Sequence, residues 1–327
     1  MKNILVYTIL SFIICFICGL ILIPILRRFK IGQPILKYVK SHESKSGTPT
    51  MGGLFFILPS VIVFLVLFGV QGRLALVSVT IGIAFLIVGF IDDFIKIKFS
   101  KNEGLKPYQK ILFMVFIALL AGAFTYVNGL TVFFIPFTSL TVNLGIFSVL
   151  IVAIIFIAVT NSVNLTDGLD GLSASVSLIY LISLLAIIII QKQQFDYLYV
   201  KPKEYEGLIL LIASLIGGIL AFLIFNIHPA KVFMGDTGSL SLGGIIGAIS
   251  IFSSNSFYIP ILGIMFVISS LSVIIQVAYY KKTKKRVFLM APFHHHLQLK
   301  GISEERIRFY YLIISALMGV ICVIFYI

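Results

Sequence analysis

Two adjacent carboxylates, Asp92 and Asp93, close a long apolar run in the segment GFIDDFIK. Carboxylates beside an apolar phase are costly unless a metal ion or a lysine neutralises them. The dipole of a helix also disfavours acids at its C-terminal end. A solvated helix end is the plainer interpretation, but the pattern favours a functional pair that binds a cation.

A polar string, NSVNLTDGLDG at residues 161–171, separates two further apolar runs and contains Asp-Gly twice. Glycine permits positive φ or the close approach of a ligand. The carboxylates of Asp167 and Asp170 can accept hydrogen bonds from a ligand or bind a cation. Two ordinary turns are the alternative, but the whole string indicates a binding loop.

A third motif, FMGDTGS at residues 233–239, begins another apolar run. Glycines and hydroxyls at the start of a helix offer backbone N–H groups to an anion. Asp236 beside them can hold a Mg²⁺ ion that bridges the same phosphate oxygens. A simple helix N-cap is the alternative role for Asp236.

Three consecutive histidines, His294, His295 and His296, lie in the segment MAPFHHHLQ. Neighbouring side chains point in different directions, so the three rings do not easily bind one ion. Imidazoles that donate to phosphate oxygens are at least as plausible as metal ligands. The spacing typical of structural zinc is missing from the sequence.

The elements that position these motifs follow from the composition. The 327 residues are 60% hydrophobic and 11% charged, with a mean hydropathy of +1.13, whereas a soluble domain carries about 25% charged residues. This chain cannot cover a water-facing surface, so we expect an all-α integral membrane protein with one polytopic domain over residues 1–327. A spanning helix needs about 20 apolar residues. Ten spans are predicted: 4–26, 53–70, 74–91, 110–128, 144–160, 172–190, 207–227, 238–252, 258–279 and 309–327.

The positive charges sort to one side of this topology. With ten spans, 20 of the 25 Lys and Arg residues fall in or beside the loops on one side, which the positive-inside rule makes cytoplasmic. Both termini are then predicted to face outward. The net charge of +13 is therefore explained by cytoplasmic loops and membrane lipids, and no nucleic-acid partner is expected.

The same partition gathers the chemistry at one face. All five histidines and nine of the twelve carboxylates lie on the cytoplasmic side of this topology. Single lysines beside the motifs, Lys45, Lys96 and Lys110, can neutralise phosphate groups, and Gln276 near the inner end of an apolar run needs a polar partner. The residues thus predict a Mg²⁺-dependent, phosphoryl-type transferase that acts on a lipid phosphate at the cytoplasmic face.

The motifs resemble one known family in the same order along nearly the whole chain. They are SKSGTPTMGG at 44–53, GFIDDFIK at 89–96, NSVNLTDGLDGLS at 161–173, FNIHPAKVFMGDTGSLSLGG at 225–244 and MAPFHHH at 290–296. This set resembles the phospho-MurNAc-pentapeptide transferases, within the polyprenyl-phosphate N-acetylhexosamine-1-phosphate transferase superfamily. The resemblance implies transfer from UDP-MurNAc-pentapeptide to undecaprenyl phosphate, giving lipid I and UMP for peptidoglycan synthesis. It also implies a Mg²⁺ cofactor, ten helices, a homodimer and a bacterial plasma membrane.

The resemblance also implies roles for individual residues. Asp236 would be the principal Mg²⁺ ligand, with Asp92 as a second candidate. Asp92 and Asp93 would form the base or electrostatic pair, and Lys96 and Lys110 would meet phosphates.

The substrate set implied by the resemblance is larger. Leu169 and Asp170 would read uracil and Phe233 would stack on it, while three residues would line the nucleotide side: Lys45, Asp167 and Asn226. Four residues would surround the sugar or diphosphate: Gln276, Ala291, His294 and His295. Asn164, Gly168 and Gly235 complete the set.

One departure from the family pattern stands out. The family commonly has an acid two residues after the histidine triplet, and here that position is Gln298. Two alternative functions stay open: a UDP-GlcNAc:polyprenyl-phosphate transferase and, from another class, a cation-coupled transporter. The predicted spans contain few ionisable residues in mid-membrane, which disfavours the transporter.

Overall fold

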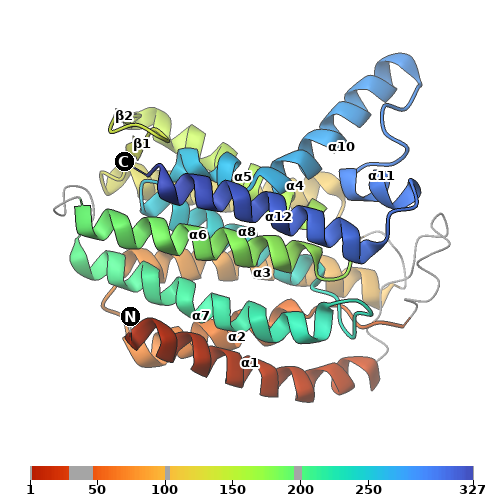
Figure 1. The fold of residues 1–327 in the computed structure, drawn as a ribbon, viewed down its shortest axis with the longest axis horizontal. Coiled ribbons are helices and arrows are strands. Elements are labelled where there is room, and N and C mark those ends of the chain that lie inside the picture. Colours follow the sequence, from red (N-terminus) through yellow and green to blue (C-terminus); the bar gives the residue numbers. More distant parts are fainter. Residues whose placement is uncertain (1, 29–46, 100–103, 195–200, 327) are drawn as a thin grey trace.

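The structure is a computed structural model that describes residues 2–28, 47–99, 104–194 and 201–326. It is an α-helical bundle whose long helices lie side by side (Figure 1). The first half contains α1 Lys2–Arg28, α2 Gly53–Phe68, α3 Arg73–Lys98, α4 Pro107–Val127 and α5 Ser148–Thr166. The second half contains α6 Leu172–Gln194, α7 Pro202–Asn226, α8 Gly235–Phe252, α9 Ile259–Leu262, α10 Ile264–Thr283, α11 Phe293–Leu299 and α12 Glu304–Ile324.

The expected membrane architecture is confirmed. Among the described residues, nine helices are long and apolar enough to cross a membrane, and α2, with 16 residues, is a shorter apolar helix. Peripheral helices expose large apolar side chains, such as Leu112 on α4 and Ile274 on α10. Exposed apolar faces of this extent suit a lipid surround rather than water. These ten helices correspond to the ten predicted spans.

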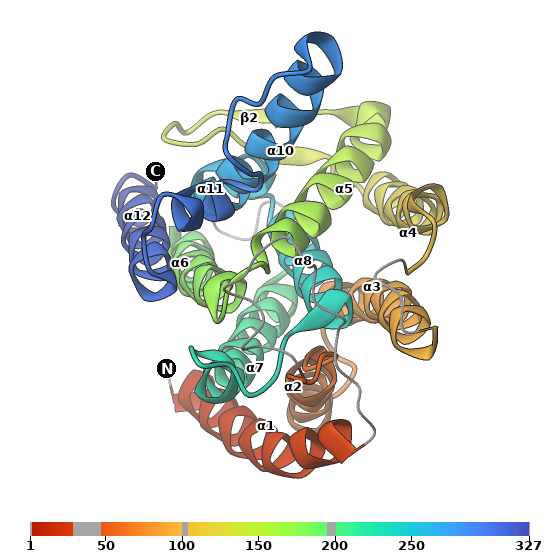
Figure 2. The same ribbon diagram turned by 90° about the vertical axis from the view of Figure 1, so that its right-hand side faces the viewer.

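Helix α8 forms the centre of the bundle (Figure 2). It is buried along almost its whole length, because its glycines let neighbouring helices approach closely. A Cβ on Gly244 would lie 2.6 Å from the Phe85 ring of α3, and one on Gly243 would lie 2.8 Å from the Thr160 backbone of α5. The hydroxyl of Ser241 also donates to the Gly82 carbonyl of α3 at 2.9 Å.

Several predicted boundaries were wrong by a few residues. Helix α3 continues to Lys98 rather than stopping at residue 91, so Asp92 and Asp93 lie inside the helix. Helix α5 continues through residues 161–166, which were expected to form a loop. In both cases polar side chains of the extra turns hydrogen-bond to other helices, which removes the cost that had suggested a helix end.

Several features of the structure were not predicted. The ninth span is two helices, α9 and α10, which meet at Gly263, and the histidine triplet lies on the short helix α11. The tenth span begins at Glu304, five residues before the predicted start. Short antiparallel strands, β1 Val132–Phe134 and β2 Thr141–Asn143, form a hairpin, which is followed by the 3₁₀ turn η2 Gly145–Phe147. A second 3₁₀ turn, η3 Ser256–Tyr258, precedes α9.

The chemistry-bearing ends of the helices gather at one end of the bundle. Helix α1 begins and α12 ends at the opposite end (Figure 1). The last turns of α3 and α5 therefore meet the first turns of α8 and α12, together with α11. All the motifs within the described residues lie at this end.

Candidate active site

Asp236, in the first turn of α8, receives side chains from three other helices. Its Oδ2 atom accepts from the Lys96 ammonium of α3 at 3.0 Å and from the Lys110 ammonium of α4 at 2.7 Å. Its Oδ1 atom accepts from the amide of Asn164, on α5, at 2.7 Å. These four residues, which the sequence analysis had singled out, lie together, and Asp236 is the point on which they converge.

Asp92 holds Lys96 in place. Its Oδ2 atom lies 2.6 Å from Lys96 Nζ, an i,i+4 pair on α3. Its Oδ1 atom accepts from the backbone N–H of Leu105 at 2.9 Å, just before α4 begins. Because Asp92 is buried, this one carboxylate fixes both the lysine and the chain that enters α4.

Asp93 caps the start of α8 from a neighbouring helix. It accepts from the backbone N–H groups of Asp236 at 3.2 Å and Thr237 at 2.9 Å, and from the Thr237 hydroxyl at 2.7 Å. A negative charge there is stabilised by the positive end of the helix dipole. Gly235 has φ of +72°, and a Cβ on it would lie 2.5 Å from Asp93 Oδ2, so this turn requires glycine.

The three carboxylates form a group whose size suits a divalent cation. Asp92, Asp93 and Asp236 each offer one oxygen, and these oxygens lie within 4.8 Å of one another. Oxygen ligands are those that Mg²⁺ prefers. With Lys96 and Lys110, three carboxylates and two ammonium groups leave one net negative charge. The donor set therefore fits Mg²⁺, in a place where the Lys96 ammonium already contacts Asp92 and Asp236.

Asp170 belongs to a second group, in the loop after α5. Its Oδ2 atom accepts from His228 Nδ1 at 2.9 Å and from the Ala230 backbone N–H at 3.1 Å. Asn226 accepts from the Gly171 N–H at 3.1 Å and donates to the Val232 carbonyl at 2.8 Å. The loops that follow α5 and α7 are therefore joined into one wall.

Gly168 has no side chain, so two of the histidines can approach the same wall. A Cβ on Gly168 would lie 2.3 Å from His294 Nε2 and 3.0 Å from His295 Nε2. His296 points elsewhere, because its Nδ1 atom accepts from the Leu289 N–H, so the three rings do not all face one place. His294 is fully buried, and within the described part of the chain neither of its ring nitrogens has a hydrogen-bond partner. Burial, and then neighbouring His295, lower the pKa of His294 well below its ordinary value, so the ring is neutral.

Asp167 lies between the two groups, at the end of α5. Burial raises the pKa of its carboxyl to about 8, and the negative charges of Asp236, Asp93 and Asp170 act in the same direction. A carboxyl with this pKa is mostly protonated at neutral pH and can donate a hydrogen bond.

The segment before α2 pairs with the segment before α8. Phe233 donates its backbone N–H to the Pro49 carbonyl at 2.8 Å and accepts from the Gly52 N–H at 2.9 Å. The Phe233 side chain is half-buried and Leu169 is buried. Lys45 lies outside the described residues.

Gln276 and Ala291 lie apart from the carboxylates. The Gln276 carbonyl oxygen accepts from the backbone N–H groups of Val287 at 3.0 Å and Phe288 at 2.9 Å. Gln276 therefore has the polar partners that its place in an apolar run requires. Both residues line a separate cleft of about 800 Å³ beneath α10. Among the described contacts, neither residue touches the Asp236 group.

Three polar residues of this site were not assigned from the sequence. Thr237 supplies two of the hydrogen bonds to Asp93, Ser239 accepts from Asn164 at 2.8 Å, and His228 binds Asp170. All three lie in the string at 225–244 that had drawn attention as a motif. Their position inside that string was the feature of the sequence that could have identified them as site residues.

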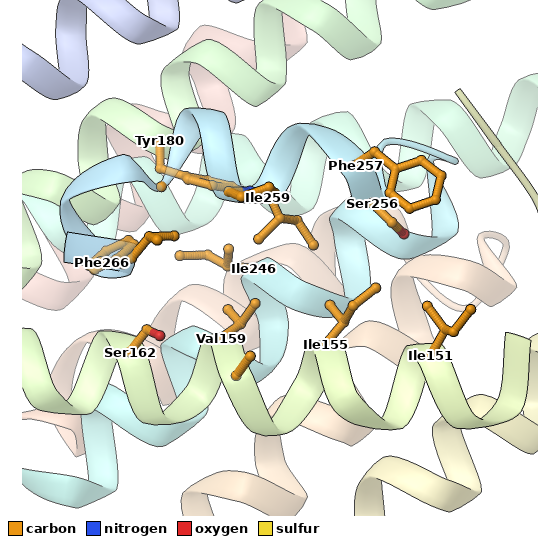
Figure 3. Close-up of a pocket in the computed structure, with 14 residues that line it drawn as sticks. Ile151, Ile155, Val159, Ser162, Tyr180, Ile246, Ser256, Phe257, Ile259 and Phe266 are labelled. Carbon is orange, nitrogen blue, oxygen red and sulfur yellow. The ribbon is translucent and has the colours of Figure 1, made fainter. Parts of the chain in front are cut away.

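An apolar cavity opens beside the same helix that carries Asn164. It encloses about 270 Å³ between α5, α9 and α10, with Ile246 of α8 at its floor. Figure 3 shows Ile155 and Val159 pointing into it from α5, opposite Phe266. Ser162, also in its lining, is two residues from Asn164.

Comparison with known proteins identifies the family. A sequence model described as glycosyl transferase family 4 matches residues 74–254, and a phospho-N-acetylmuramoyl-pentapeptide-transferase signature matches residues 45–57. A phospho-N-acetylmuramoyl-pentapeptide-transferase of Clostridioides difficile is 40% identical, over 98% of this chain and 97% of its own. The chain belongs to the phospho-N-acetylmuramoyl-pentapeptide-transferase family. A member from Halalkalibacterium halodurans is 43% identical over 91% of this chain and 90% of its own.

Membership of the phospho-N-acetylmuramoyl-pentapeptide-transferase family confirms the resemblance read from the motifs. A member from Desulfitobacterium hafniense, 38% identical, covers 97% of this chain and 96% of its own. The family signature includes Pro49 and Gly52, whose backbone pairs with Phe233. This family signature therefore spans the strand-like contact that leads into the first turn of α8.

Proposed function

We propose that this protein transfers phospho-MurNAc-pentapeptide from UDP-MurNAc-pentapeptide to undecaprenyl phosphate, producing lipid I and UMP for peptidoglycan synthesis. An oxygen of the lipid phosphate forms a new bond to the phosphorus that carries the sugar. The phosphoanhydride bond to UMP breaks, and UMP leaves with that electron pair. Relatives with this activity in their names, matched over nearly the full length of the chain, support the proposal.

The observation that carries the proposal is the convergence of two lysines on carboxylates at one bundle end. Lys96 and Lys110 both contact Asp236, and both can turn from it to phosphate oxygens when an anionic substrate arrives. Asp236, with Asp92 as second ligand, would hold Mg²⁺, which supplies charge stabilisation for the two phosphates. Asp93 keeps the first turn of α8, and hence Asp236, in position.

Each remaining residue is assigned to the part of UDP-MurNAc-pentapeptide that it would contact. In this proposal Asp170, Leu169 and Phe233 bind the uracil, and Asn226 keeps their loops together through the Gly171 and Val232 backbone. Asp167, Gly168, Gly235, Asn164 and Lys45 complete the nucleotide and phosphate side. His294 and His295 meet the diphosphate or sugar, and Gln276 and Ala291 line the cleft beyond them.

The acceptor's apolar chain is assigned to the cavity beside α5. An isoprenoid chain seated against Ile155 and Val159 would be bound in a mainly apolar surround. If the lipid followed α5 from Ser162 to Asn164, its phosphate would lie near Asp236, which binds Asn164. A lipid site that ends at the cation cluster fits a substrate with an apolar tail and an anionic head.

The orientation and the assembly are also proposals. The excess of Lys and Arg at the motif-bearing end supports an active site on the cytoplasmic side of a bacterial plasma membrane. The chain is proposed to be a single polytopic domain and to form a homodimer, as the family resemblance implies.

The test is release of radiolabelled UMP by purified protein. UMP should appear only when polyprenyl phosphate and Mg²⁺ are both present, and UDP-MurNAc-pentapeptide should be used far better than UDP-GlcNAc. Preference for UDP-GlcNAc would instead support the alternative sugar transferase. Cation flux into liposomes without UMP release would support a transporter and refute the proposed reaction.

A further inference from the structure

A chain of polar contacts runs from the histidine triplet to α12. His295 Nδ1 lies 3.1 Å from Gln298 Oε1, one helical turn along α11. The Gln298 amide nitrogen then donates to Glu304 Oε1, in the first turn of α12, at 3.3 Å. Neither Gln298 nor Glu304 has a role in the proposed transfer.

The chemistry of the three groups fixes the direction of each hydrogen bond. An ionised carboxylate only accepts hydrogen bonds, so the NH₂ group of Gln298 must face Glu304. The amide oxygen then faces His295, and because a carbonyl oxygen only accepts, His295 Nδ1 must carry the hydrogen. The Glu304 carboxylate thus determines the tautomer of a neutral His295 through Gln298.

This tautomer places an acceptor at the candidate active site. In neutral His295 with Nδ1 protonated, Nε2 has a lone pair. That Nε2 atom would lie 3.0 Å from a Cβ on Gly168, so it faces the loop of Asp167 and Asp170. The opposite tautomer would present an N–H group at the same place and would repel a donor.

Glu304 also lies near the opposite wall of the site. Its Oε2 atom lies 4.0 Å from His228 Nδ1, and His228 binds Asp170 at 2.9 Å. The carboxylate therefore lies between the helix that carries His295 and the loop that carries Asp170.

We propose that Gln298 is a positioning residue, oriented by Glu304, which holds His295 with Nδ1 protonated so that Nε2 accepts a hydrogen bond from a substrate O–H or N–H group. This inference rests on the proposed function, in which His295 contacts the donor substrate. It assigns a specific role to a residue that departs from the family pattern.

The first experiment separates position 298 from general stability. Gln298→Met keeps the side-chain length but makes no hydrogen bond, and kcat/KM for the UDP-substrate at pH 8 should fall about tenfold. Lys300→Met, at the exposed residue that caps the C-terminal end of the same short helix, is the matched control and should keep wild-type kcat/KM. Both variants should retain a wild-type melting temperature. Wild-type kcat/KM for Gln298→Met would overturn the proposal.

The second experiment exchanges the two partners. Gln298→Glu alone places two carboxylates together, and their repulsion should turn the new side chain out of position and lower kcat/KM. Adding Glu304→Gln restores the pattern, because a carboxylate at position 298 accepts both from His295 Nδ1 and from the new amide. Recovery of most of the lost kcat/KM in the double variant supports the proposal, whereas additive losses contradict it.

A third measurement does not depend on turnover. The ¹⁵N NMR spectrum of histidine-labelled protein should show His295, identified by its absence in His295→Gln, with Nδ1 protonated in the wild type. Gln298→Met should remove that preference, and an unchanged spectrum would refute the proposal. If His295→Gln keeps full activity, the role of His295 in the proposed function fails instead, and if wild-type protein releases no UMP, the function itself fails.

Discussion

Asp236 is a single residue that side chains from three other helices contact. Lysines from α3 and α4 and an amide from α5 meet its two oxygens, while its own backbone N–H is held by Asp93. Polar groups brought out of water are tolerated when each has a partner. The same groups that stabilise Asp236 without substrate are those that a diphosphate would contact.

We expect Asp236→Asn to lower UMP release at least 100-fold while the protein stays folded. A metal ion that contacts two phosphates stabilises developing charge by several kcal/mol. An amide is a poorer Mg²⁺ ligand than a carboxylate. The measurement is UMP release over a Mg²⁺ titration, with Glu206→Gln on α7 as a control at the other end of the bundle. Near-normal turnover at limiting Mg²⁺ would exclude Asp236 as the chief ligand.

Asp92 is expected to orient cations more than to act as a base. A phosphate monoester has a second pKa of about 6 and is mostly dianionic at neutral pH, so little proton remains to be removed. In the structure both oxygens of Asp92 are engaged, by Lys96 and by the Leu105 N–H. The activity of Asp92→Asn should therefore barely recover at alkaline pH, but it should respond to excess Mg²⁺ or to Mn²⁺.

The assay for Asp92 is a pH–rate profile at several metal concentrations. Complete recovery of Asp92→Asn well above pH 6, without sensitivity to metal concentration, would restore the general-base role. Lys96→Gln provides a comparison, because its defect should not depend on pH in the same range.

Asp167 should make stability depend on pH. Its pKa is about 8 in the folded protein but about 4 in an unfolded chain. The protonated carboxyl favours folding fully below about pH 4, and this contribution is lost as pH rises to about 8. Asp167→Asn, which cannot ionise, should therefore melt above wild type by a margin that widens between those pH values. Melting curves at matched scan rates without Mg²⁺ test this, and equal margins at all pH values would contradict it.

At the scale of helices, close glycine contacts determine where the catalytic turn of α8 lies. A Cβ on Gly53, the first residue of α2, would lie 2.3 Å from the Cα of Gly238 on α8. One on Gly89 of α3 would lie 2.2 Å from the carbonyl oxygen of Asp236. Backbone atoms cannot move aside as a side-chain end can, so these contacts set the position of Asp236.

Gly53→Ala should therefore impair both stability and turnover. Overpacking of this kind typically costs about 1–3 kcal/mol, and it would displace the turn that holds Asp236. Gly247→Ala is the matched control, because its nearest neighbour is the Phe156 ring at 3.3 Å. Melting temperature and UMP release should both fall for Gly53→Ala and change little for Gly247→Ala. Equal behaviour of the two variants would show that the contact is not needed.

At the scale of the whole molecule, the bundle has two chemically different ends. Helix α1 begins and α12 ends at one end, beside the β1–β2 hairpin, whereas the motifs and the basic residues after α10, Lys284, Lys285 and Arg286, lie at the other (Figure 1). A bilayer perpendicular to the helices would separate these ends. The charge excess predicts that the motif end is cytoplasmic.

Cysteine labelling in intact cells can test this orientation. Ser139→Cys, in the exposed hairpin turn, should react with a membrane-impermeant maleimide, whereas Lys285→Cys should react only after permeabilisation. The unsubstituted chain is the control for labelling of the natural cysteines, of which Cys15 and Cys322 are buried and Cys18 is half-buried. Labelling of Lys285→Cys from outside would invert the topology and move the site to the outer face.

Hydropathy and motifs were enough to predict the membrane class and the ten helices, and they named the candidate site residues. Hydropathy is a local property, so spans and their order can be read without knowledge of packing. Asp92, Asp93, Asp236 and the lysines were evident because charged residues beside apolar runs need an explanation. Family motifs then supplied the reaction, which relatives with matching names support.

The packing of the helices determines the separate role of each of those residues. Asp93 caps α8 although 143 positions separate it from Asp236, and Gln298 meets Glu304 of another helix. The helical turns beyond residues 91 and 160 likewise persist because their polar side chains find partners elsewhere in the bundle. Such partners are brought together by helix packing, which depends on side-chain shape along whole helices and leaves no local pattern in the sequence.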